Sequence, residues 1–146
     1  MKKTILTVLL ALLLSWVIMG CGDPEPDAAE LDTLLSDMGL TDFPFPSGGT
    51  LDNFEDASTT SQYLVKVLYT GVNESAFTTY KATLRDKAAN IRAAAERPTV
   101  DPGAMAGTYT IQGVFITVNF YNQYGKDQAG FGVEENSVAI YFTKNK

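Results

Sequence analysis

The sequence of 146 residues contains no histidine, and it has a single cysteine and a single tryptophan. Without histidine, the chain lacks the Ser-His-Asp triad, the Cys-His pair, most catalytic zinc sites and the commonest general base. One cysteine forms no internal disulfide, so the fold must be held together by its hydrophobic core. We therefore predict that the protein is not an enzyme, with no catalytic residue, no metal site and no cofactor.

Basic residues are also scarce. The chain has 11 Lys and Arg against 17 Asp and Glu, and its formal net charge is -6. From Gly22 to Val65 there is no Lys or Arg, and the acidic residues of this stretch are Asp23, Glu25, Asp27, Glu30, Asp32, Asp37, Asp42, Asp52, Glu55 and Asp56. A segment of this charge repels nucleic acid and anionic surfaces, so we expect no nucleic-acid partner.

The N-terminus has the pattern of a secretion signal. Lys2 and Lys3 precede an uncharged stretch from Ile5 to Met19. This stretch is shorter than the roughly 20 residues that a membrane-spanning helix needs, and it fits the apolar core of a signal peptide. It ends in Ile18-Met19-Gly20-Cys21, which resembles the lipobox of bacterial lipoproteins: an apolar residue, a variable one and a small one before a cysteine.

In lipoproteins of this kind, a peptidase cuts before the cysteine and its thiol carries a diacylglycerol. The resemblance therefore implies a signal peptide over residues 1–20 and lipidation at Cys21, so that the membrane is a partner through this lipid. The implied location is extracytoplasmic, on the cell membrane or the outer membrane. A secreted protein with a chance cysteine at its cleavage site is the alternative.

Residues 21–42 are predicted to form an acidic tether that contains a short helix, and residues 43–146 a single domain. Asp27 is a good N-cap, with Glu30 three residues later, and Gly39 suits the position after a helix. These signals predict a helix over about 28–38.

Alternating apolar residues predict strands over 51–55 and 61–70. A long helix is predicted over 74–96, because Asn73 is a good N-cap and Val72 and Phe77 have the spacing of a hydrophobic staple. Its apolar face is formed by Phe77, Tyr80, Leu84, Ala88, Ile91 and Ala95. Further strands are predicted over 108–112, 114–121 and 137–143, the first two joined by a tight turn at Gln112-Gly113.

The predicted fold class is α+β: an antiparallel sheet of about five strands with one long helix on one face. The element order is β-β-α-β-β-β, preceded by the short helix. The segment Tyr69–Tyr80 resembles a motif of small bacterial lipoprotein domains of unknown function, in which a strand ends in Thr-Gly and Phe-x-x-Tyr opens a capped helix. The resemblance covers about residues 43–143 and supports the fold, but implies no activity.

For function, we predict a membrane-anchored, non-enzymatic binding or interaction module of the cell envelope, with a protein partner there. One alternative is an inhibitor or accessory subunit of an envelope enzyme. Another is a weak carboxylate-based hydrolase, with candidate carboxylates at Asp52, Glu55, Asp56, Glu134 and Glu135.

A glycine-rich loop is predicted over 122–136, long enough to be either functional or mobile. With Tyr121, Tyr124 and Phe131 among glycines and polar residues, it is a candidate recognition surface. Alternatively, Tyr124 and Phe131 fold back over the end of the sheet.

Overall fold

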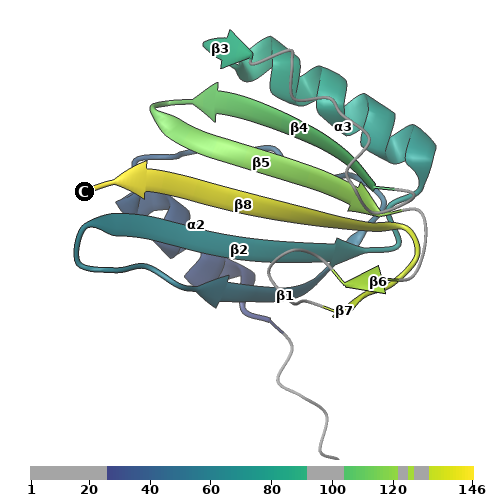
Figure 1. Ribbon diagram of the computed structural model, residues 1–146, viewed down its shortest axis with the longest axis horizontal. Coiled ribbons are helices and arrows are strands. Elements are labelled where there is room, and N and C mark those ends of the chain that lie inside the picture. Colours follow the sequence, from purple (N-terminus) through teal and green to yellow (C-terminus); the bar gives the residue numbers. More distant parts are fainter. Residues whose placement is uncertain (1–25, 92–103, 122–124, 127–131) are drawn as a thin grey trace, which may run out of the picture.

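The computed structural model describes residues 26–91, 104–121, 125–126 and 132–146, and it confirms the predicted α+β class (Figure 1). The helices and strands of these residues are α2 (Ala28–Asp37), β1 (Thr50–Asp56), β2 (Gln62–Thr70), α3 (Glu74–Lys87), β3 (Asn90–Ile91), β4 (Ala104–Ile111), β5 (Val114–Tyr121), β6 (Gly125–Lys126), β7 (Gly132–Val133) and β8 (Ser137–Asn145).

One antiparallel sheet contains the five long strands and the two-residue β3, in the order β1-β2-β8-β5-β4-β3. The C-terminal strand β8 lies between β2 and β5, and so joins the first hairpin of the chain to the later one. A separate two-stranded pair, β6-β7, lies in the connection from β5 to β8. The predicted order of elements along the chain matches only in part, because the short strands β3, β6 and β7 were not predicted.

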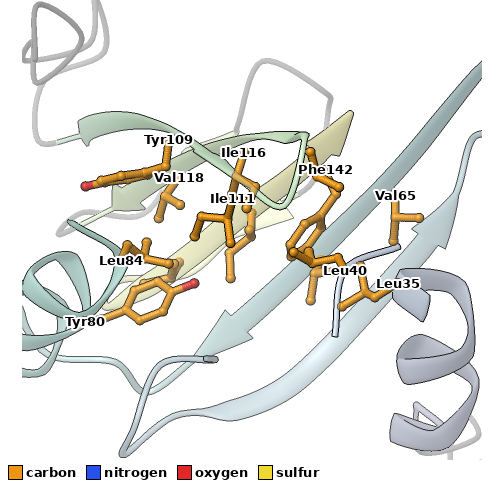
Figure 2. Packing of buried hydrophobic residues seen from close by; sticks show 14 of the residues in the cluster. Leu35, Leu40, Val65, Tyr80, Leu84, Tyr109, Ile111, Ile116, Val118 and Phe142 are labelled. Atoms are coloured by element: carbon orange, nitrogen blue, oxygen red, sulfur yellow. The ribbon is translucent and has the colours of Figure 1, made fainter. Parts of the chain in front are cut away.

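Both described helices cover the same face of the sheet. Alternation places Val67 of β2, Ile140 of β8 and Val118 of β5 in one row, and the neighbouring rows follow the same register. These residues share a core cluster with Leu35 of α2 and Leu84 of α3. Figure 2 shows the helix side chains pointing at this face of the sheet. The core is therefore a single layer between the sheet and the two helices.

The start of α3 forms as the sequence predicts. The Asn73 side-chain Oδ1 accepts a hydrogen bond from the backbone N–H of Ala76 at 2.9 Å, which satisfies one of the free donors of the first turn. Val72 and Phe77, the two positions of the predicted staple, are both fully buried in the core cluster. Local capping and burial thus agree on where this helix begins.

The end of α3 does not match the prediction, and the helix predicted over 74–96 is wrong in its length. It stops at Lys87, after 14 residues, and is about 21 Å long at about 1.5 Å per residue. The Ala89 N–H then donates to the carbonyl of Thr110 at 3.0 Å, and β3 pairs with β4. Sheet pairing therefore replaces helical hydrogen bonds at a point where Asn and Ile are weaker helix formers than Ala. The remainder of the predicted helix lies outside the described residues.

The short helix α2 belongs to the core, although the sequence assigned it to the tether. Leu31, Leu35 and Met38 are at most 2% exposed and lie in the main core cluster. The helix ends in the motif predicted for a glycine after the last turn: the Gly39 and Leu40 N–H groups donate to the Ser36 and Leu35 carbonyls, at 2.8 and 2.9 Å. The packed unit therefore includes this helix.

Three long-range hydrogen bonds hold the chain just after α2 against the rest of the domain. Lys144 Nζ of β8 donates to the Met38 carbonyl at 2.7 Å, where the negative end of the helix dipole favours a cation. The Thr41 N–H donates to Gln112 Oε1 at 2.8 Å, and Lys87 Nζ donates to the Asp42 carbonyl at 3.2 Å. These bonds connect the segment to three different elements of the domain.

The β4–β5 hairpin has the predicted two-residue turn. Gln112 and Gly113 have φ values of 49° and 78°, as the tightest hairpin turns require. Two residues before Tyr109, Gly107 makes room for the tyrosine ring, because a Cβ there would lie 2.7 Å from the hydroxyl oxygen and 2.9 Å from Cε2. The glycine thus allows the tyrosine ring to lie along its own strand.

The strand β1 forms one edge of the sheet and is mostly exposed. Its pairing with β2 shifts register between Leu51 and Asn53, so that Asp52 occupies a bulge. Glu55 and Asp56 follow on the same strand. The edge is therefore both irregular and acidic.

Candidate binding surfaces

The face of the sheet opposite the helices carries the side chains that alternate with the core residues. Its rows are set by the strand register: Leu64 of β2 aligns with Thr143 of β8 and Phe115 of β5, and the next row holds Lys66, Tyr141 and Thr117. In the view of Figure 1, α2 lies behind the sheet and this face is turned to the reader.

One end of this face is buried. Leu68, Tyr121 and Ala139 form a second hydrophobic cluster, separate from the main core, and are 3%, 6% and 0% exposed. Ser137, in register with Tyr121, is also fully buried. In Figure 1 the β6-β7 pair overlaps this end of the sheet in projection. The domain therefore contains a small second core on the face without helices.

The other end of the same face is accessible. Phe115 is 39% exposed, and among the described residues it is the one large hydrophobic residue that is exposed. Tyr141, Leu64, Thr117 and Thr143 around it are half-buried. This mixture of an aromatic ring, aliphatic groups and hydroxyls is typical of a protein-interaction surface, where aromatic residues are enriched.

The charged groups beside this surface partly cancel. Lys66 Nζ lies 3.0 Å from Glu55 Oε2 on the adjacent strand, with side chains 18% and 50% exposed. An ion pair this exposed contributes only about 0–1 kcal/mol to stability. The ion pair neutralises the one lysine of β2 with a carboxylate of β1. The accessible end of the sheet face therefore presents mainly apolar and hydroxyl groups.

The predicted recognition residues are only partly described. Tyr121 is the last residue of β5 and lies in the buried second cluster, so its ring offers little surface to a partner. Tyr124 and Phe131 lie outside the described residues, and so does Cys21. The sequence predicts an open sheet face opposite the long helix, but it did not single out Phe115 or Tyr141 on that face.

Two of the candidate carboxylates, both on β1, take part in local interactions. Glu55 is paired with Lys66, and Asp56 Oδ1 accepts a hydrogen bond from the Ser58 N–H at 2.9 Å. This and a side-chain hydrogen bond from Ser58 lower the pKa of Asp56, the opposite of the shift that an acid catalyst needs. Glu134 and Glu135 are exposed. Among the described residues, no three Cys, Asp or Glu side chains gather as metal ligands.

A buried hydroxyl lies in the main core. Tyr80 is 3% exposed, and its hydroxyl has no hydrogen-bond partner within the described part of the protein. Burial, and to a lesser extent Tyr69 and Tyr109, raise the pKa of Tyr80 well above its ordinary value. Figure 2 shows this hydroxyl directed into the space between α3 and the sheet. This hydroxyl lies in the main core and away from the accessible face, so it affects the stability of the domain and not its binding surface.

Comparison of the chain with protein-family models, with curated proteins and with solved structures finds no match. The resemblance to small bacterial lipoprotein domains therefore stays a prediction. In the described residues, no helix is long and apolar enough to cross a membrane. The surfaces of the domain and the N-terminal motif are therefore the features that bear on its function.

Proposed function

We propose that the protein is a lipid-anchored, extracytoplasmic lipoprotein that acts as a non-enzymatic binding module of the cell envelope. The observation that carries the proposal is the accessible end of the sheet face, with Phe115 at 39% exposure and the half-buried Tyr141 and Leu64 on the next two strands of the sheet. An aromatic anchor within a ring of half-buried neighbours has the composition of an interaction hot spot. The partner is a protein of the same compartment.

The anchor in this proposal is Cys21. Only residues 22–26 separate it from the Asp27 cap of α2, and this stretch reaches at most about 20 Å when fully extended. Since α2 is packed into the core, the start of α2 stays within that distance of the bilayer surface and holds the domain near it. Its partner is therefore one that reaches, or is itself held at, the membrane.

Two measurements test these parts separately. Replacement of Cys21→Ala should move the protein from the membrane fraction to the soluble fraction; a mutant that still fractionates like the wild type refutes the anchor. For the binding surface, a photo-reactive benzoylphenylalanine is placed at Phe115 and, as a matched control, at Thr79 on the exposed side of α3.

After illumination of whole cells, position 115 should give one dominant cross-linked protein, and position 79 should not. No cross-link at 115, or the same product from both positions, contradicts the proposed surface. Repeating the experiment with Cys21→Ala shows whether capture of the partner depends on the anchor.

A further inference from the structure

A pocket of about 400 Å³ opens on the helix side of the domain, between α2 and the extended chain that follows it. Its lining residues are Asp32, Leu35, Ser36, Leu40, Thr41, Asp42, Phe43 and Phe45. Leu35 and Leu40 are buried, whereas Asp32 and Asp42 are exposed. The pocket thus combines an apolar base, two aromatic rings and two carboxylates at the solvent side.

The two rings of the pocket are fixed by other aromatic residues. Phe45 stacks on Tyr69, with ring centroids 5.3 Å apart and an interplanar angle of 26°. Phe43 meets Phe142 of β8 edge to face at 4.9 Å, and the two phenylalanines contact each other at 5.2 Å. Both rings therefore pack against residues of strands, and side chains that are packed before a ligand binds lower the cost of binding.

The pocket is also negatively charged. Neither Asp32 nor Asp42 forms an ion pair with any described residue, and no Lys or Arg lines the pocket. Lys87 Nζ donates to the backbone carbonyl of Asp42 at 3.2 Å, so a cation lies near Asp42 and partly offsets its charge. Burial and, secondarily, the charge of Asp32 raise the pKa of Tyr69 to about 12, and Asp32 lines the same pocket as Phe45, which stacks on Tyr69.

We propose that this pocket binds the guanidinium group of an arginine side chain of a partner polypeptide. A guanidinium is planar and weakly hydrated, so that it stacks on an aromatic ring such as Phe45 while its N–H groups bind a carboxylate such as Asp32. The aliphatic stem of arginine then covers Leu35 and Leu40. This site is distinct from the sheet face and does not depend on the function proposed above.

The test is an NMR titration of the chain from Gly22 to Lys146, which contains the whole described fold. The probe is N-acetylarginine methylamide, and the matched control is the citrulline analogue, which has nearly the same shape but no charge. The arginine probe should give saturable shifts at the pocket residues, and the citrulline probe should bind about tenfold more weakly. Equal binding of the two, shifts elsewhere only, or no saturable binding overturns the proposal.

Two further comparisons sharpen the result. Asp32→Asn should weaken the arginine probe about tenfold, whereas Asp37→Asn, on the same helix but outside the pocket lining, should leave its affinity unchanged. The lysine analogue should bind more weakly than the arginine probe; equal affinity refutes selection of a guanidinium. Guanidinium ion without a stem should also bind more weakly, and equal affinity would refute recognition of a side chain.

Discussion

Replacement of Leu35→Ala should destabilise the whole domain, because α2 is part of its core. Leu35 is 2% exposed and lies in the cluster that also contains Val65 and Phe142. Truncating a buried leucine costs about 2–5 kcal/mol, through lost burial and the cavity left behind. At about 4 °C per kcal/mol for a domain of this size, a middle value of about 3 kcal/mol lowers the melting temperature by roughly 12 °C.

The assay is urea and thermal unfolding of the chain from Gly22 to Lys146, followed by circular dichroism and by the NMR signals of the sheet methyl groups. Ser36→Ala is the control, because Ser36 is exposed on the same helix and should change stability by less than about 0.5 kcal/mol. If Leu35→Ala removes helical signal but leaves the unfolding midpoint of the sheet unchanged, α2 is a separate appendage and the reasoning is refuted.

Three other perturbations follow from single contacts. Tyr80→Phe should leave the free energy of unfolding in urea unchanged or raise it by about 1 kcal/mol, since the lost hydroxyl is buried without a described partner; a clear decrease would reveal a hydrogen bond. Lys144→Met should lower it by about 1–3 kcal/mol by removing the bond to the Met38 carbonyl, and an unchanged midpoint would contradict this. Hydrogen bonds from Ser58 lower the folded-state pKa of Asp56 below 3.8. The wild type should therefore be more stable than Asp56→Asn at pH 7 and lose this advantage as the pH falls below about 4. A stability difference that does not change with pH would contradict this role of Asp56.

The parts of the fold that were predicted correctly are those with local signals. The Asn73 cap, the glycine after α2 and the Gln112-Gly113 turn each need only neighbouring residues to form, and all are present. The sequence identified β1, β2, β5 and β8 with small errors at their ends, but it missed the first half of β4, which begins at Ala104 and not at Thr108. Local chemistry is sufficient for the cap, the glycine and the turn, because their hydrogen-bond partners lie close in the chain, whereas β2 and β8 pair across about 75 residues.

The prediction errors arise where contacts with residues distant in the sequence determine the structure. The alanine-rich end of the predicted helix has good helix propensity, but β4 offers backbone partners to residues 90–91, and no local pattern shows this. Likewise, the apolar stripe of α2 predicts a buried face but not what buries it. The pocket beside α2 was missed for the same reason, because Asp32 and Phe45 become neighbours only once the chain has folded back against β2 and β8.

The acidic bulge on β1 determines how two copies of the domain meet. An open edge strand is a template on which another sheet can continue, and anchoring many copies to one surface would multiply such encounters. Here an approaching second copy would set its own Asp52 and Asp56 against the same two carboxylates, while the bulge breaks the straight row of donors and acceptors. The charge and the bulge of this edge therefore disfavour edge-to-edge pairing of two copies.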